Sequence, residues 1–214
     1  MTMAAPLLEI DKLTKVYKRG RLFPKETFRL EASLRFEGPQ IVGVMGPNGS
    51  GKTTLFELVT GSNQPTSGSV RCLGQDIHRV KYKERDRLAI HYHQSYQVRH
   101  FARSVPSALL EHSVSDYPMV HLFDEPQFNR QDGYIGFMLD FFRALRKRER
   151  LVFLCVHPQE PYHIDILREI CEQFVFVRKG AVRQAPSYDA LLEGEDVRDY
   201  LGKLANHHTS RVTA

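Results

Sequence analysis

The sequence predicts an α/β fold: a mainly parallel β-sheet flanked by helices, with an N-terminal antiparallel β annex. Four segments are continuously apolar, as in strands buried on both faces of a parallel sheet, namely 41–45, 119–123, 151–156 and 174–178. Helix-like stretches lie between or after them, at 52–60, 134–148, 162–172, 187–193 and 196–205. Before them, 7–18 and 27–36 alternate apolar and polar residues, which predicts half-exposed antiparallel strands.

A glycine-rich loop joins the first buried strand to the first helix. It reads Gly46-Pro47-Asn48-Gly49-Ser50-Gly51-Lys52-Thr53 and is a complete phosphate-binding P-loop. Glycines let successive backbone N–H groups face phosphate oxygens, and the helix adds its positive N-terminal end. Lys52 is expected to reach the β- and γ-phosphates, and Thr53 to offer its hydroxyl to Mg²⁺. The loop and Thr54 therefore predict a site for a nucleotide and Mg²⁺.

Composition limits the classes of protein that fit. The chain has 214 residues, of which 42% are hydrophobic and 26% charged, so one well-cored soluble domain is expected, without a membrane span. We expect this domain to cover 1–206, followed by a flexible tail at 207–214. Cys72, Cys155 and Cys171 lack paired spacing and are expected to be free thiols. The start of the chain shows no signal-peptide pattern, which favours the cytoplasm.

Two carboxylates follow the apolar run at 119–123. Asp124 and Glu125 stand at its carboxyl end, the edge where α/β sheets bind ligands. In P-loop enzymes the first carboxylate of such a pair helps to hold Mg²⁺, and the second orients or deprotonates the attacking water. Together with the P-loop, the pair predicts nucleotide hydrolysis.

Histidines have several interpretations. His157 follows the apolar run at 151–156, where an imidazole could donate to the γ-phosphate and sense its presence. His121 is expected to pack inside its strand. His91 and His93 are spaced to share one face of a strand, but without further ligands at convincing spacing a metal site there is the less favoured interpretation.

Several motifs in order make the chain resemble an ATP-binding cassette (ABC) ATPase subunit over nearly its whole length. The P-loop resembles Walker A, and Val120 to Glu125 resembles Walker B with its catalytic glutamate. The resemblance implies that Tyr17 stacks on adenine and that His157 is the switch histidine. It also implies that Gln94 is the Q-loop glutamine, which acts in catalysis and at Mg²⁺, although Tyr96 or Gln97 could compete for that position.

The interval between Gln94 and Asp124 departs from the family. It is several tens of residues shorter than usual, it contains nothing like the LSGGQ signature, and it allows one short helix from about Pro106. We therefore expect a strongly reduced helical subdomain at 95–118. Because family members clamp ATP between two subunits through that signature, its absence predicts a loss of roughly 10³–10⁵ in rate unless another chain supplies the clamp. Alternatively, Arg99, His100 or Arg103 could stand in.

The resemblance implies a cytoplasmic ATPase subunit, peripheral at the inner face of a membrane, that energises a transporter or another envelope machine. Integral-membrane subunits are the expected partners, together with a second ATPase subunit or a second copy of this chain. The alternative is a nucleotide-binding regulatory or structural subunit with little turnover. The net charge of +5 alone does not imply nucleic acid, and no such partner is expected.

Overall fold

The computed structural model describes residues 5–93, 118–126, 128 and 134–207. The strands in chain order are β1 Leu8–Arg19, β2 Lys25–Phe36, β3 Ile41–Met45, β4 Ser67–Cys72, β5 Gln75–Asp76, β6 Ala89–Tyr92, β7 Val120–Asp124, β8 Leu151–Cys155, β9 Gln173–Arg178 and β10 Ala181–Ala185. The helices are α1 Lys52–Val59, α2 Tyr82–Leu88, α5 Tyr134–Lys147, α6 Pro161–Ile170, α7 Tyr188–Leu192, α8 Glu195–Leu201 and the 3-10 helix η1 Gly202–Asn206.

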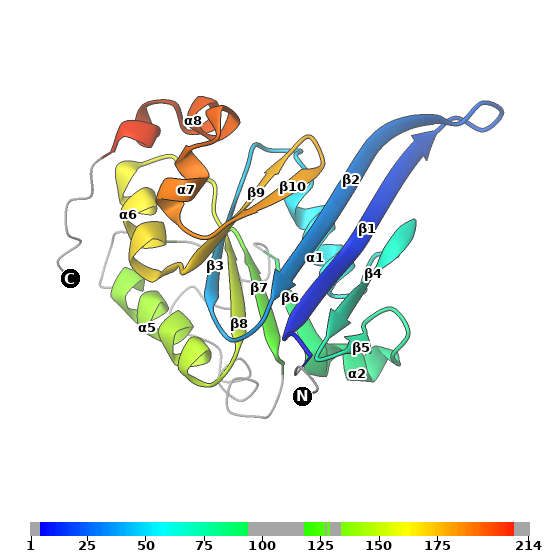
Figure 1. Ribbon diagram of the computed structural model, residues 1–214, viewed down its shortest axis with the longest axis horizontal. Coiled ribbons are helices and arrows are strands. Elements are labelled where there is room, and N and C mark those ends of the chain that lie inside the picture. The colour runs from blue at the N-terminus through cyan, green and yellow to red at the C-terminus, as the bar shows by residue number, and fades with distance from the viewer. Residues whose placement is uncertain (1–4, 94–117, 127, 129–133, 208–214) are drawn as a thin grey trace.

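In the described part of the chain, ten strands form one sheet with the order β5-β4-β1-β2-β10-β9-β3-β8-β7-β6 (Figure 1). The five strands β9, β3, β8, β7 and β6 run parallel to one another, whereas β10 pairs antiparallel with β9. By contrast, β1 pairs antiparallel with both β2 and β4. The predicted fold class is thereby confirmed. The antiparallel strands continue the same sheet, because β2 and β10 pair in parallel at Glu31 and Ala181.

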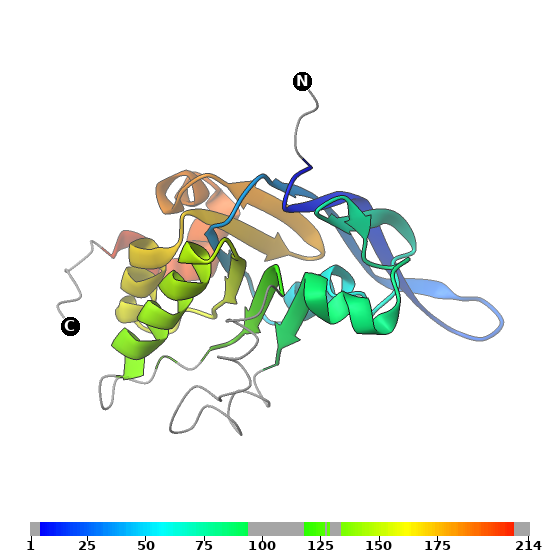
Figure 2. The same ribbon diagram turned by 90° about the horizontal axis from the view of Figure 1, so that it is seen from below.

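Strands β3, β7 and β8 are buried at every position, which explains their largely apolar sequences. In β3, Ile41 and Met45 join a core that also contains residues of α5 to α8, while Val42 and Val44 join a second core with residues of α1. Figures 1 and 2 show α5 and α6 side by side, away from α1 and α2. The sheet therefore separates two helical layers.

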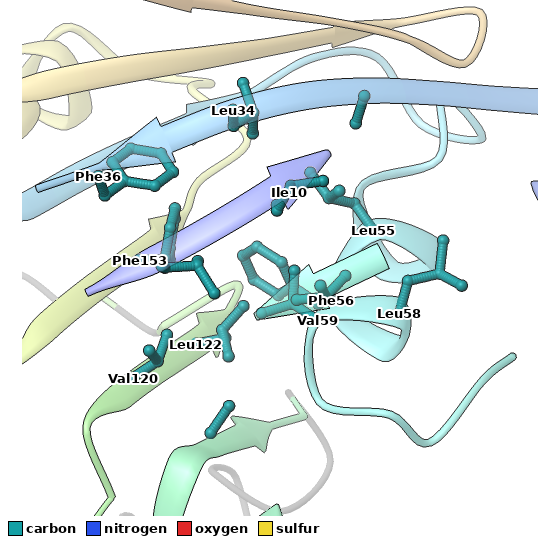
Figure 3. Close-up of a cluster of buried hydrophobic side chains, with 14 of the residues drawn as sticks. Ile10, Leu34, Phe36, Leu55, Phe56, Leu58, Val59, Val120, Leu122 and Phe153 are labelled. Carbon is teal, nitrogen blue, oxygen red and sulfur yellow. The ribbon is translucent and has the colours of Figure 1, made fainter. Parts of the chain in front are cut away.

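Helix α1 is enclosed between the two parts of the sheet. In Figure 3, Phe56 of α1 lies among Ile10 of β1, Phe36 of β2 and Phe153 of β8. The rings of Phe36 and Phe153 are 5.1 Å apart and meet edge to face, and Phe56 lies 6.2 Å from Phe153. This packing fixes the first turn of α1, and with it the end of the P-loop.

The elements that were not predicted include β4, β5 and α2. Strand β4 contains glycine and serines, which disfavour strands, and it forms because β1 supplies its partner. Gly68 has a φ of 84° and approaches the bulge of β1 so closely that a Cβ would lie 2.3 Å from the carbonyl oxygen of Lys12. Helix α2 is polar and buries only Leu88, so it lacks the apolar stripe that reveals a helix.

The predicted helix at 196–205 is divided. Helix α8 ends at Leu201, and Gly202, with a φ of 54°, starts the 3-10 turn η1. In the predicted tail, His207 shares a hydrogen bond with Asp165, at 2.9 Å. The rest of that tail, 208–214, lies outside the described residues.

The three cysteines are free, as expected, and Cys72 and Cys155 are buried. Among the helices of the described residues, none combines the length and the apolar character needed to cross a bilayer.

Candidate nucleotide-binding site

The P-loop turns tightly between β3 and α1. A Cβ on Gly46 would lie 2.0 Å from the carbonyl oxygen of Val177, and a Cβ on Gly51 would lie 2.8 Å from the ring of Phe28. Both glycines also have positive φ, at 150° and 111°. Gly51 caps the N-terminus of α1, while Gly49 has open space on its side-chain face. Glycine at 46 and 51 lets the loop backbone approach the neighbouring strands. The opposite side of the loop stays accessible.

Backbone contacts hold the loop in place. The N–H of Gly180, between β9 and β10, donates to the carbonyl of Ser50 at 2.9 Å, and the N–H of Ser50 donates to the carbonyl of Pro47 at 3.2 Å. The carbonyl of Gly180 accepts from the N–H of Glu31 in β2 at 2.8 Å. The loop is thus tied to both parts of the sheet through one hairpin.

Lys52 and Thr53, the first residues of α1, connect the loop to its surroundings. The Lys52 ammonium is buried and donates to the carbonyls of Gly46 and Pro47, at 2.7 and 2.9 Å. The Thr53 hydroxyl donates to Oδ2 of Asp124, at the end of β7, at 3.0 Å. Two motifs far apart in the sequence therefore meet through this hydrogen bond.

Asp124 is buried and charged. Burial raises its pKa, but contacts with His91, Cys155 and Thr53 outweigh that effect and leave the pKa of Asp124 below its ordinary value. The side chain is consequently a carboxylate at neutral pH, which suits a partner of Mg²⁺ or another cation.

Glu125 follows at the point where β7 ends. Its φ is 51°, a left-handed conformation that is uncommon for glutamate, and its N–H donates to the carbonyl of Cys155 at 2.9 Å. This turn directs the chain out of the sheet and leaves the residue half-buried at the sheet edge.

A cavity of about 600 Å³ lies over the loop. Its walls include nine of the predicted site residues: Tyr17, Asn48, Gly49, Gly51, Lys52, Thr53, Thr54, Asp124 and Glu125. Among the described residues, Gly46, Ser50 and His157 are not part of this lining. The cavity thus combines glycine backbone with a lysine, a hydroxyl and carboxylates. These groups fit a nucleoside triphosphate with Mg²⁺.

The antiparallel strands contribute one wall of this cavity. Tyr17 is 37% exposed, its ring lies 6.2 Å from that of Phe28, and its hydroxyl accepts from the amide of Asn63 at 2.7 Å. Sequence reasoning missed Thr27 and Phe28, which also line the cavity. Phe28 pairs with Tyr17 in the β1–β2 register and Thr27 precedes it at the register shift, so a register prediction for that hairpin could have found them.

His157 stands two residues after β8 and is half-buried. Its Nδ1 shares a hydrogen bond with the hydroxyl of Tyr200 in α8, at 2.8 Å. Burial raises the pKa of Tyr200 above its ordinary value, so the phenol stays protonated. Tyr200 therefore fixes one edge of the imidazole. No sequence motif predicted this role.

Several predictions concern residues outside the described ranges. Gln94, its competitors Tyr96 and Gln97, and the cationic candidates Arg99, His100 and Arg103 all lie there. So does the reduced helical subdomain, apart from Pro118 at its end.

The fold, together with the hydrogen bond that joins Thr53 of the P-loop to Asp124, defines a P-loop nucleotide-binding protein. A family model described as "ABC transporter" matches residues 30–125, which contain both of these motifs. This match supports the resemblance to ABC ATPase subunits that the motifs predicted. ATP with Mg²⁺ is the cofactor of the ATP-binding domains of this family.

Curated relatives carry similar names. The chain is 46% identical over 72 residues to the ATP-binding protein ChvD of Rhizobium radiobacter, which covers 34% of this chain and 23% of that protein. It is 29% identical to the thiamine import ATP-binding protein ThiQ of Vibrio parahaemolyticus, over 86% of this chain and 93% of that protein. The match thus spans less than a quarter of ChvD but nearly all of ThiQ.

The solved structures agree on the fold. One is a dimeric post-hydrolysis state of the ATP-binding cassette MJ0796 bound to ADP and Pi, with a TM-score of 0.64 and 16% identity. The alignment covers 84% of this chain and 98% of that one.

Proposed function

We propose that this chain binds and hydrolyses ATP as the cytoplasmic subunit of a membrane-associated ABC-type transporter or envelope machine. The observation that carries the proposal is the hydrogen bond from Thr53 to Asp124 beside a cavity that Lys52 and Glu125 also line. It brings phosphate-binding and acidic residues to one place, as phosphoryl transfer to water requires.

Each residue has a role in this proposal. The N–H groups around Gly51 and the N-terminus of α1 face the phosphates, and the Lys52 ammonium exchanges its carbonyl partners for phosphate oxygens. Thr53 and Asp124 hold Mg²⁺, with Gln94 as a further contact. Bound Mg²⁺ would neutralise charge that develops on the phosphates. Tyr17 offers its partly exposed ring to the adenine.

Glu125 and His157 are proposed to act on the reaction itself. Glu125 orients the attacking water and accepts its proton, a contribution of roughly 10²–10⁴ in rate. His157 is held through Nδ1 by Tyr200, so Nε2 is the nitrogen that would donate to the γ-phosphate.

The proposed partners follow from the family. Integral-membrane subunits, and a second ATPase subunit or a second copy of this chain, would complete the assembly. The name of ThiQ, an import ATP-binding protein, supports transport for this chain. No nucleic acid is proposed as a partner.

Two substitutions test the proposal. Lys52→Ala should weaken ATP binding at least about tenfold, because the loop loses its only side-chain cation. Glu125→Gln should keep ATP binding and reduce phosphate release at least about 100-fold in the complex with its partners. Binding is measured with a fluorescent ATP analogue, and release with an assay for inorganic phosphate. If Lys52→Ala binds ATP as tightly as the parent chain, the nucleotide site is wrong.

A second candidate function is a nucleotide-binding regulatory subunit with little turnover. The sequence between Gln94 and Asp124, which holds no LSGGQ-like signature, favours it. The same Glu125→Gln measurement separates the two. Unchanged phosphate release by the complex would assign hydrolysis to another subunit.

A further inference from the structure

Two histidines and one aspartate meet at the ends of β6 and β7. Tyr92 pairs with Phe123 in the parallel register. His91 and His93, on either side of Tyr92, therefore share one face of the sheet and lie next to Asp124. One ligand atom of each of these three residues lies within 4.8 Å of the other two. The spacing of the histidines was visible in the sequence, but the third ligand, Asp124, comes from another strand.

His91 is the best-defined member of this cluster. Its side chain is only 5% exposed, and its ring packs edge to face on Phe56 at 5.3 Å. In the part of the chain that the structure describes, its Nδ1 has no hydrogen-bond partner, and its Nε2 has only the Asp124 carboxylate, 3.4 Å away and outside normal hydrogen-bond geometry. Buried polar nitrogens normally have a partner, so this imidazole points to a missing ligand.

The distances suit a metal ion. His91 Nε2 and Asp124 Oδ2 are 3.4 Å apart. Two ligands about 2.0–2.1 Å from a tetrahedral zinc ion are separated by ~3.3 Å, close to this distance. The rings of His91 and His93 have centroids 3.8 Å apart, and exposed His93 can turn its nitrogen inward.

The cluster is also accessible. A second cavity, of about 300 Å³, is lined by His91 and His93 together with Thr60 and Arg85. The Arg85 guanidinium is engaged by the carbonyl of Gly61 at 2.7 Å. The cavity gives a cation a route to the histidines and leaves room for a water molecule as a further ligand.

We propose that His91, His93 and Asp124 bind a first-row transition-metal dication such as Zn²⁺, at a site that shares Asp124 with the proposed Mg²⁺ site. Two imidazoles and one carboxylate are a common zinc ligand set, whereas Mg²⁺ prefers oxygen ligands.

This site would also affect nucleotide binding, a consequence that rests on the proposed function. Oδ2 of Asp124 accepts the hydrogen bond from Thr53 and is the same oxygen that lies near His91. A metal ion on the histidines would draw this oxygen away from Thr53. We therefore expect Zn²⁺ and Mg²⁺-ATP to weaken the binding of each other.

The first experiment titrates the nucleotide-free protein with Co²⁺, which replaces Zn²⁺ and reports its coordination by visible absorption. We expect one ion per chain, with the bands of a four- or five-coordinate site. His93→Ala, which changes an exposed side chain, should weaken binding about tenfold or more. His91→Gln should do the same. His163→Gln, in α6 on the opposite face of the sheet, is the matched control and should bind like the parent chain.

Thermal unfolding of each variant without metal checks that it is folded. No Co²⁺ spectrum in the parent chain would overturn the proposal, as would an unchanged affinity in folded His93→Ala. Because no nucleotide is present, this result does not depend on ATP binding.

The second experiment measures Mg²⁺-ATP affinity with and without added Zn²⁺. When Zn²⁺ is added, the parent chain should lose more of its affinity for Mg²⁺-ATP than His93→Ala does. Since Zn²⁺ binds free ATP equally in both samples, the difference between the two proteins reports the protein site. Equal losses of Mg²⁺-ATP affinity in the two proteins would contradict the antagonism. Lys52→Ala is measured in parallel: if it binds Mg²⁺-ATP as tightly as the parent chain, the nucleotide site is wrong, whereas the Co²⁺ titration tests the metal site alone.

Discussion

The contact of Tyr200 with His157 gives a prediction for a single hydroxyl group. Tyr200→Phe removes the oxygen that lies 2.8 Å from His157 Nδ1 and keeps the ring that packs near Phe176. The imidazole then loses its orientation, so we expect kcat for ATP hydrolysis to fall about tenfold, the lower end of the effect seen when a metal-binding histidine loses its orienting partner. KM should change less than kcat, because no residue that lines the nucleotide cavity is substituted.

Tyr188→Phe is the matched control. The Tyr188 hydroxyl is buried and has no hydrogen-bond partner among the described residues, so its removal should leave kcat unchanged. Steady-state phosphate release by the complex measures all three proteins. An unchanged kcat in Tyr200→Phe would show that the contact does not position His157.

Residues close together in the chain were the predictable part of the site. The P-loop carries its chemistry in consecutive residues, and Asp124 and Glu125 follow an apolar strand whose end is visible in the sequence. Tyr200 reaches His157 only through tertiary packing, so no local pattern could identify it, whereas finding Phe28 required the register of the β1–β2 hairpin. The metal cluster illustrates the same limit, because its third ligand is supplied by a neighbouring strand.

At the scale of elements, the β9–β10 hairpin holds the P-loop through Gly180. A Cβ at this position would lie 1.7 Å from the carbonyl oxygen of Arg29, and its φ of 81° disfavours any side chain. Gly180→Ala should therefore lower the free energy of unfolding by more than about 2 kcal/mol. ATP affinity should fall as well, because the hydrogen bond from Gly180 to Ser50 is disturbed.

Gly38→Ala is the control for that substitution. A Cβ on Gly38 has no atom within 4 Å, so its effect on stability should stay within about 0.5 kcal/mol. Urea denaturation gives both free energies, and a fluorescent ATP analogue gives the affinities. Similar stabilities for the two variants would contradict the proposed role of the hairpin.

The elements that could be predicted are those whose own residues decide their structure. The buried strands β3 and β8 have apolar residues at every position, and α5 has a clear amphipathic pattern before its basic end. Strand β4 and helix α2 form because of neighbours that are distant in the chain. Their sequences alone contain too little apolar periodicity to reveal them.

At the scale of the whole molecule, the nucleotide cavity spans the two parts of the sheet. Tyr17, Thr27 and Phe28 come from the antiparallel part, whereas Lys52 and Asp124 belong to the parallel part and α1. In the described chain, β2 and β10 provide the strand pairing across this junction, with one residue pair. Bound ATP would thus hold together two regions that the sheet joins only weakly.

Hydrogen exchange tests this coupling. With saturating Mg²⁺-ATP, amides of β1 and β2 near the cavity should exchange more slowly, as should those of α1, because bound ligand reduces opening of both regions. In Tyr17→Ala, saturated with nucleotide, only α1 should remain protected, since the adenine then lacks its aromatic contact in β1. Phe23→Ala changes an 85% exposed ring at the tip of the same hairpin and should retain both effects. Full protection of β1 and β2 in Tyr17→Ala would mean that the phosphates alone couple the two parts of the sheet.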